Sequence, residues 1–348
     1  MKIIEFGISR ICSEGPAYFI AEIGHNHQGK LPTALEMIKK AAECGVQAVK
    51  FQKRDNKTLY TTRYYERPYD NENSYGATYG AHREYLEFGW NEYAELMKCA
   101  EDSKVEFMCT PFDMPSVAFL EKLGITSYKI ASADLTNTIL LKEVARTGKP
   151  MFVSTGASAL DEVKRAYEEI LRYHDLVCFM HCTAGYPTEY KDLNLRVLAT
   201  LKRELPQAVV GYSGHDNGIL APIIAYLMGA VVIEKHFTLN HAWKGTDHKF
   251  SLEPEGLRKQ VRDLRRVDEA AGNPEKMVYD FEKAAREKMG KSIYAARDLS
   301  VGEMLSVADV CIKSPGGGLP PYRIEEVVGK KLKAALKEED MIISDLLE

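Results

Sequence analysis

Residues 209–236 read VVGYSGHDNGILAPIIAYLMGAVVIEKH, and this stretch contains one complete strand–helix–strand unit. Two short apolar runs, Val209–Tyr212 and Val231–His236, are typical of strands that are buried on both faces of a parallel sheet. The segment between them, Asn217–Met228, is long enough for a helix. Gly229 follows it, where a left-handed cap is commonly needed. The unit therefore predicts a parallel sheet whose strands are joined by helices.

The same alternation extends from residue 17 to about residue 270. Six more strand-like runs precede the unit above, and they are Tyr18–Ile23, Ala48–Gln52, Val105–Thr110, Ser127–Ile130, Met151–Ser154 and Val177–His181. Helical stretches such as Leu31–Cys44, Trp90–Ser103 and Ala157–Tyr173 separate them. Eight alternations over roughly 255 residues favour a closed (β/α)₈ (TIM) barrel over an open sheet.

The end of the chain has a different character. We expect a barrel domain over residues 1–270, a linker over 271–288 and a small β-rich domain over 289–348. Ser292–Ala296 and Val310–Lys313 are its clearest strands, and SPGGGLPPY (314–322) is a Gly/Pro-rich loop. Within the barrel, the connection 53–89 is unusually long and carries seven tyrosines. Loops of this length are usually functional or disordered, so we expect an ordered loop over the active-site face, with a packing excursion as the alternative.

Composition excludes several classes of protein. The 348 residues are 45% hydrophobic and 28% charged, with a formal charge of −4, which gives no overall electrostatic attraction for nucleic acid or an anionic membrane. The seven cysteines form no CxxC pair, and the N-terminal residues do not resemble a signal peptide. We therefore expect a soluble, cytoplasmic protein with reduced thiols.

Polar side chains occur at the C-terminal end of every strand-like run. They include Glu22, Lys50, Gln52, Thr110, Lys129, Ser132, Ser154, His181, Ser213, His215, Glu234, Lys235 and His236. In a (β/α)₈ barrel these ends meet at one face, and the chemistry of such enzymes takes place there. A barrel that served only as a scaffold would not need polar groups on every strand, so the pattern predicts an active site.

His215 and His236 belong to neighbouring strands of the closed barrel. Two imidazoles in this position could bind a first-row divalent ion, with Glu22, Glu234 or Asp247 completing the site. The alternative is that each is a hydrogen-bonded core histidine. His25, His27 and His181 are weaker candidates.

Lys50 and Lys129 are predicted to point into a partly enclosed space. A buried lysine needs an anionic partner or a lowered pKa. Together with Ser132, Ser154 and Ser213 they could bind a phosphate and a carboxylate. Schiff-base formation by one lysine, or pairing of a lysine with Glu22 or Glu234, remains open at this point.

The motifs that carry these residues resemble those of the N-acetylneuraminate (sialic acid) synthase family. They run in order through residues 19–254 and read FIAEIGHNHQG, VKFQK, TPFD, YKIASAD, STGAS, HCTAGYP, GYSGH, IEKHFTL and KGTDHKFSLEP. The long 53–89 connection is similar to that of vertebrate-type members. The C-terminal segments KSIYAARDLSVGEMLS and VVGKKLKAALKEED are similar to the antifreeze-like (SAF) domain of the family.

This resemblance implies condensation of phosphoenolpyruvate with N-acetylmannosamine, or its 6-phosphate, to give N-acetylneuraminate, or its 9-phosphate, and phosphate. It implies a divalent metal on His215 and His236, usually Mn²⁺, with Mg²⁺ or Co²⁺ as alternatives. Glu22 and Glu234 are the implied catalytic carboxylates. The implied phosphoenolpyruvate ligands are Lys50, Thr110, Lys129, Ser132, Ser154 and Ser213, and Gln52, Tyr186, Glu234 and Asp247 line the sugar site. The implied assembly is a domain-swapped homodimer.

Two positions depart from the pattern of many bacterial members. Ala184 stands where they have asparagine, and Ser314 stands where their SAF domain places an arginine over the sugar of the partner subunit; Lys313 or Tyr322 could replace that arginine. A synthase of legionaminic or pseudaminic acid is therefore an alternative, and a Schiff-base aldolase is a more distant one. Arg63, Arg67, His82 and Arg83 in the long connection could receive a 6-phosphate on the sugar.

Overall fold

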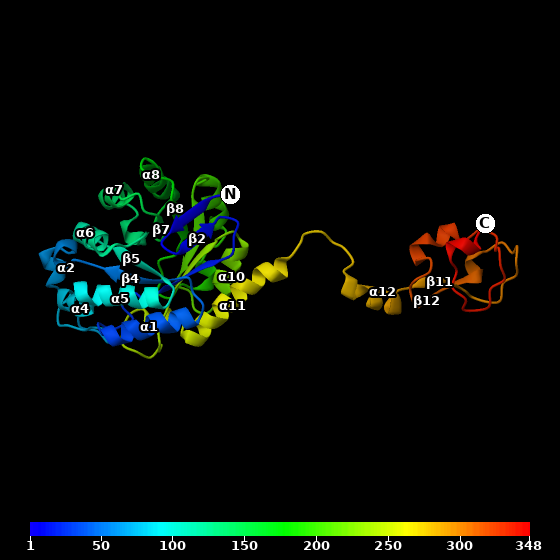
Figure 1. Cartoon of the computed structure of the whole chain (residues 1–348), viewed down its shortest axis with the longest axis horizontal. Coiled ribbons are helices and arrows are strands. Elements are labelled where there is room, and N and C mark those ends of the chain that lie inside the picture. The colour runs from blue at the N-terminus through cyan, green and yellow to red at the C-terminus, as the bar shows by residue number, and fades with distance from the viewer. The chain divides into compact units, whose positions relative to one another are not determined.

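The computed structural model describes all 348 residues, which form two compact units, Met1–Gly272 and Asn273–Glu348 (Figure 1). The first unit contains a closed barrel of eight parallel strands in which β10 pairs with β3. The strands are β3 (Tyr18–Glu22), β4 (Ala48–Lys53), β5 (Glu106–Pro111), β6 (Tyr128–Ile130), β7 (Met151–Ser154), β8 (Val177–His181), β9 (Val209–Gly214) and β10 (Val232–His236). The predicted (β/α)₈ barrel is confirmed.

One helix follows each strand and covers the outside of the barrel. These helices are α1 (Leu31–Glu43), α5 (Trp90–Asp102), α6 (Met114–Leu123), α7 (Thr138–Arg146), α8 (Leu160–Leu171), α9 (Val197–Glu204), α10 (Leu220–Leu227) and α11 (Pro254–Ala271). Helix α6 shows how the sequence sets their ends. The Asp113 carboxylate accepts a hydrogen bond from the Ser116 N–H at its start, and Gly124 ends it at φ +86°.

A hairpin of two strands, β1 (Ile3–Phe6) and β2 (Ser9–Cys12), precedes the barrel. Sequence reasoning did not anticipate it. Ile4, Phe6 and Ile11 are buried against residues that point inward from the N-terminal halves of the barrel strands, and the rings of Phe6 and Phe152 lie 5.4 Å apart. The hairpin therefore closes the lower end of the barrel, where the strands begin, with apolar side chains.

The long connection after β4 is ordered. It contains α2 (Asn56–Leu59), α3 (Thr62–Tyr65) and α4 (Tyr79–Leu86), and its tyrosine rings pack on one another. It also contacts the loop that follows β10, since the Gly245 N–H donates to the Asn73 side chain at 3.0 Å. Two loops that are far apart in sequence thus form one wall above the barrel.

The second unit has its own small core, formed by residues that include Ile293, Leu305 and Ile342. Its regular elements are α12 (Lys283–Met289) and the antiparallel pair β11 (Ser292–Ala295) and β12 (Val310–Lys313). This unit begins at Asn273, whereas the sequence analysis predicts a linker over residues 271–288. No helix in the chain combines the length and the apolar character needed to span a bilayer.

The hairpin provides a test of this architecture. Ile4 is 0% exposed below the barrel and Ile8, in the hairpin turn, is 71% exposed. Ile4→Ala should lower the free energy of unfolding of the barrel by about 2–5 kcal/mol because it leaves a cavity, whereas Ile8→Ala should change it by less than about 0.5 kcal/mol. Urea unfolding followed by circular dichroism measures both. Equal midpoints for the two variants would contradict the packing of the hairpin.

Candidate active site

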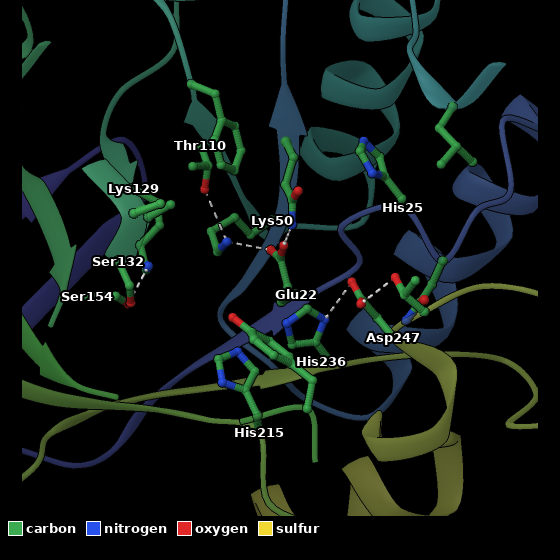
Figure 2. A pocket seen from close by; sticks show the side chains of 18 of the residues that line it. Glu22, His25, Lys50, Thr110, Lys129, Ser132, Ser154, His215, His236 and Asp247 are labelled. Carbon is green, nitrogen blue, oxygen red and sulfur yellow. Dashed lines mark hydrogen bonds and ion pairs between the residues drawn. The ribbon is translucent and has the colours of Figure 1, made fainter. Parts of the chain in front are cut away.

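A cavity of about 260 Å³ opens at the C-terminal ends of the barrel strands (Figure 2). Thirteen of the predicted site residues line it, namely Glu22, Lys50, Gln52, Thr110, Lys129, Ser132, Ser154, Tyr186, Ser213, His215, Glu234, His236 and Asp247. The inward positions at the lower ends of the strands are apolar, and those at the upper ends are polar. The cavity therefore has an apolar floor and a polar lining.

Two lysines and two glutamates form a buried network in this cavity. Lys50 Nζ lies 2.5 Å from Glu22 Oε2 and 3.7 Å from Glu234 Oε1, and Lys129 Nζ lies 3.8 Å from Glu234 Oε1. All four side chains are no more than 4% exposed. The Glu–Lys pairing considered from sequence is therefore present, and each charge is compensated by another one, as burial in a barrel interior requires.

The environment shifts the pKa values of Glu22 and Glu234 in opposite directions. Burial raises the pKa of Glu22, and the negative charge of Glu234 adds to this effect against the attraction of Lys50. Burial also opposes ionisation of Glu234, but Lys129 and Lys50, with the Ser213 hydrogen bond, hold its pKa below the ordinary value. Glu22 is thus the better proton carrier and Glu234 the better carboxylate.

Hydroxyl groups surround the two ammonium groups. Lys129 Nζ donates to Ser154 Oγ at 2.6 Å, and Lys50 Nζ donates to Thr110 Oγ1 at 3.2 Å. On the Lys129 side, the Gly156 N–H donates to Ser132 Oγ at 3.0 Å. Cationic and hydroxyl donors around one space are the groups that bind phosphate and carboxylate oxygens.

His215 and His236 face each other across the cavity, with ring centroids 5.4 Å apart. His215 Nδ1 lies 3.2 Å from the Thr183 carbonyl oxygen, so this nitrogen carries the proton and leaves the Nε2 lone pair free. His236 Nδ1 is buried without a hydrogen-bond partner, 3.8 Å from Asp247 Oδ2. Burial lowers the pKa of each imidazole to about 4; His236 adds to this effect at His215, whereas Asp247 opposes it at His236.

These two residues fit a divalent metal ion. Metal ligation needs neutral imidazoles, and a carbonyl that fixes the tautomer is the usual support for a ligating histidine. No group of three or more His, Cys, Asp and Glu side chains is gathered closely enough to form a complete site. The two imidazoles would supply nitrogen ligands, and oxygen atoms would occupy the remaining positions.

A second cationic cluster, formed by Arg54 and Arg83, lines the cavity beside the long connection after β4. The sequence analysis identified Arg83 but not Arg54. Arg54 is 7% exposed and stacks on Phe112 at 3.6 Å, and Arg83 donates two hydrogen bonds to Tyr79 Oη. The two guanidinium groups approach opposite nitrogens of His25, at 3.2 and 3.3 Å. Burial, followed by the two arginines, holds the pKa of His25 well below its ordinary value.

A neutral imidazole has a single acceptor nitrogen, so His25 cannot accept from both arginines at once. An anionic group between them would supply the missing acceptor. Of the residues proposed from sequence for a phosphate on the sugar, His82 and Arg83 line the cavity, whereas Arg63 and Arg67 are exposed outside it.

His27 and His181, the weaker metal-ligand candidates, are engaged in packing and hydrogen bonds outside the cavity. His27 stacks on Phe88 and accepts from the Gly29 N–H, and His181 Nε2 contacts the Leu193 carbonyl oxygen at 2.7 Å. Ala184 does not line the cavity. Lys235 was counted among the polar strand ends, but it points away from the site into the layer between strands and helices, because side chains alternate along β10.

Three comparisons with known proteins agree. The NeuB family model matches residues 37–276, and the SAF domain model matches residues 290–348. The N-acetylneuraminate-9-phosphate synthase of Homo sapiens is 38% identical over 96% of this chain and 93% of its own length. The N,N'-diacetyllegionaminic acid synthase of Legionella pneumophila is 35% identical over 98% of both chains. The crystal structure of N-acetylneuraminic acid synthetase from Leptospira borgpetersenii superposes with a TM-score of 0.71 at 30% identity, over 82% of this chain and 96% of that one.

The pair of imidazoles makes a direct prediction about metal affinity. His236→Ala removes one of two nitrogen ligands, so the dissociation constant for Mn²⁺ should rise by at least about 100-fold, as measured by electron paramagnetic resonance on the substrate-free protein. His174→Ala, beyond helix α8 at the opposite end of the barrel, is the matched control and should leave Mn²⁺ affinity unchanged. Equal Mn²⁺ binding by the His236 variant and the wild type would rule out this ligand pair.

Proposed function

This chain belongs to the NeuB family, and from that premise we propose that it condenses phosphoenolpyruvate with an N-acetylated amino sugar. The reaction forms a carbon–carbon bond, consumes one water molecule and releases inorganic phosphate. The observation that carries the proposal is the juxtaposition, in one cavity, of two buried lysines among hydroxyl groups with two neutral histidines. The favoured sugar is N-acetylmannosamine or its 6-phosphate.

Phosphoenolpyruvate carries a phosphate and a carboxylate, and each requires cationic donors. Lys50 and Lys129 are the proposed charge partners, with Thr110, Ser132, Ser154 and Ser213 as hydroxyl donors. In the structure the two ammonium groups are compensated by Glu22 and Glu234. Anionic substrate oxygens would take over part of this compensation, which would allow Glu22 and Glu234 to act on protons instead.

His215 and His236 are the proposed metal ligands, with Mn²⁺ as the favoured ion and Mg²⁺ or Co²⁺ as alternatives. A divalent ion bound there would supply Lewis-acid polarisation of the sugar aldehyde. Tyr186 packs on His215, with ring centroids 4.3 Å apart, and Asp247 lies beside His236. These two residues, with Gln52, are proposed to orient the open-chain sugar so that its aldehyde carbon meets carbon 3 of the enol.

The two carboxyl groups have separate proposed roles. As carbon 3 attacks the aldehyde, the aldehyde oxygen takes up a proton, and Glu22 is placed to supply it because its raised pKa favours the protonated form. Water then adds to the cation at carbon 2, and Glu234, which stays ionised, accepts the proton that this water loses. The resulting intermediate then breaks its carbon–oxygen bond to phosphate; its hydroxyl proton passes to the departing phosphate, and the ketone remains.

The SAF domain is proposed to act in a domain-swapped homodimer. Its surface carries large exposed apolar residues, such as Tyr322 at 83% exposure, of the kind that assemblies often cover. Ser314, which stands in place of the arginine of bacterial members, accepts a hydrogen bond from Lys291 Nζ at 2.6 Å. Lys313 already pairs with Glu339, so Tyr322 is the better replacement for that arginine.

A synthase of another nonulosonate is the nearest alternative, because it would use the same phosphoenolpyruvate and metal groups with a different sugar. A Schiff-base aldolase has one observation in its favour, namely that burial, assisted by Lys50, lowers the pKa of Lys129 against the attraction of Glu234. Family membership favours the synthase. Trapping with borohydride and pyruvate separates the two chemistries.

The arginine pair predicts which form of the sugar is used. Arg83→Met should raise the KM for N-acetylmannosamine 6-phosphate by about 10- to 100-fold, because it removes charge-assisted hydrogen bonds to the phosphate, and should leave the KM for unphosphorylated N-acetylmannosamine within about threefold. Arg67→Met is the matched control, because Arg67 is an exposed arginine of the same connection that does not line the cavity. Equal kcat/KM of the wild type for the two sugars would remove the reason for a phosphate site.

A further inference from the structure

A charged pair that the reaction does not use lies on the outer side of the barrel wall, directly behind the two histidines. Lys235 and Asp216 are both 0% exposed. Lys235 Nζ lies 3.1 Å from Asp216 Oδ1 and also donates to the Asp216 backbone carbonyl. The Tyr212 hydroxyl donates to the same carboxylate oxygen at 2.7 Å. None of these three residues lines the active-site cavity.

The surroundings of this pair are apolar. Tyr212 of β9 and Ile233 of β10, the neighbouring outward-pointing residues, belong to the core between the strands and the helices. Removing an ammonium and a carboxylate from water costs several kcal/mol each, and well-packed apolar residues could replace such a pair without loss of stability. The position of the pair in the chain suggests what it contributes.

Asp216 directly follows His215, and Lys235 directly precedes His236. The hydrogen-bonded register of β9 with β10 ends at the pair Gly214–Lys235. His236 is still held by pairing with Glu22 of β3, whereas His215 lies beyond the end of the β9 ladder. Lys235 is therefore the group that ties the segment after Gly214 back to β10.

Gly214 shows how closely this segment is folded around the pair. A Cβ atom at this position would lie 2.4 Å from the Tyr212 ring and 2.5 Å from Asp216 Oδ1. The hydrogen bond between Tyr212 and Asp216 thus passes directly over Gly214, and only glycine leaves room for it. On the other side, His215 O accepts from the Thr188 N–H at 3.1 Å. The backbone of His215 is consequently held between β10 and the loop after β8.

We propose that Lys235 is a positioning residue which, through its ion pair with Asp216, sets the spacing of His215 and His236 and thereby the affinity of the site for a divalent metal. The inference rests on the proposed function, since it takes these two histidines as the metal ligands. Groups that orient metal ligands from behind commonly change metal affinity by 10- to 100-fold when removed. Here the orienting contact acts on the backbone next to each ligand.

Lys235→Met tests this proposal, because methionine keeps most of the side-chain volume and removes the charge. The dissociation constant of the substrate-free protein for Mn²⁺, measured by electron paramagnetic resonance, should rise by at least about 10-fold. Affinity for phosphoenolpyruvate in the absence of metal should stay within about twofold, because its proposed ligands lie mostly on other strands. Lys235→Arg restores a donor for Asp216 and should recover part of the Mn²⁺ affinity. Lys98→Met, on the exposed face of α5, is the matched control.

Tyr212→Phe provides a second test if Lys235→Met does not fold. It removes a single hydroxyl from Asp216 and should weaken Mn²⁺ binding by about two- to fivefold, because only part of the energy of the lost hydrogen bond reaches the ligand. Unchanged Mn²⁺ affinity in a folded Lys235→Met protein, or in Tyr212→Phe if the former does not fold, would overturn the proposal. If His236→Ala also binds Mn²⁺ normally, the ligand assignment itself is wrong; if His236→Ala loses Mn²⁺ and Lys235→Met does not, only the positioning role is wrong.

Discussion

The alternating network of Lys50, Lys129, Glu22 and Glu234 is the constraint on which the rest of the site depends. Four ionisable groups in the interior of a barrel are tolerated only while each charge has a compensating neighbour. The apolar floor formed by the N-terminal hairpin keeps this network at the upper end of the barrel. The proposed anionic substrate would therefore meet lysines whose charge is already balanced by carboxylates, and its binding would redistribute that balance.

The same arrangement shifts the pKa values of two chemically equal carboxyl groups in opposite directions. Glu22 is pushed toward its protonated form by burial and by Glu234, and Glu234 is held ionised by both lysines. The histidines are kept neutral by burial, which leaves their nitrogens available to a metal. The pKa of the proposed acid is thus raised, that of the proposed base is lowered, and burial favours the neutral form of the proposed metal ligands. The proposed role of the Lys235–Asp216 pair is to hold these imidazoles in place.

Much of the site could be predicted from the sequence, because the rules involved are local. Buried parallel strands appear as apolar runs, and the last inward positions of those runs must lie around one opening; this is why Lys129, Ser154 and Glu234 were found. The rest depends on packing that a single sequence does not display. Arg54 lies one residue beyond its strand, and its direction is set by stacking on Phe112. Lys235 points to the outer side of the barrel wall, as the alternation of side chains along β10 predicts, but its pairing with Asp216 is not visible in the sequence.

The most direct test of the account measures two products in one reaction mixture that contains the protein, Mn²⁺, phosphoenolpyruvate and N-acetylmannosamine or its 6-phosphate. Inorganic phosphate is assayed first, and borohydride is then added to trap any lysine adduct for mass spectrometry. The account predicts one phosphate released for each sugar consumed, loss of that release with EDTA, and no adduct on Lys50 or Lys129. A borohydride-trapped adduct on either lysine, with sugar consumed but no phosphate released, would contradict it.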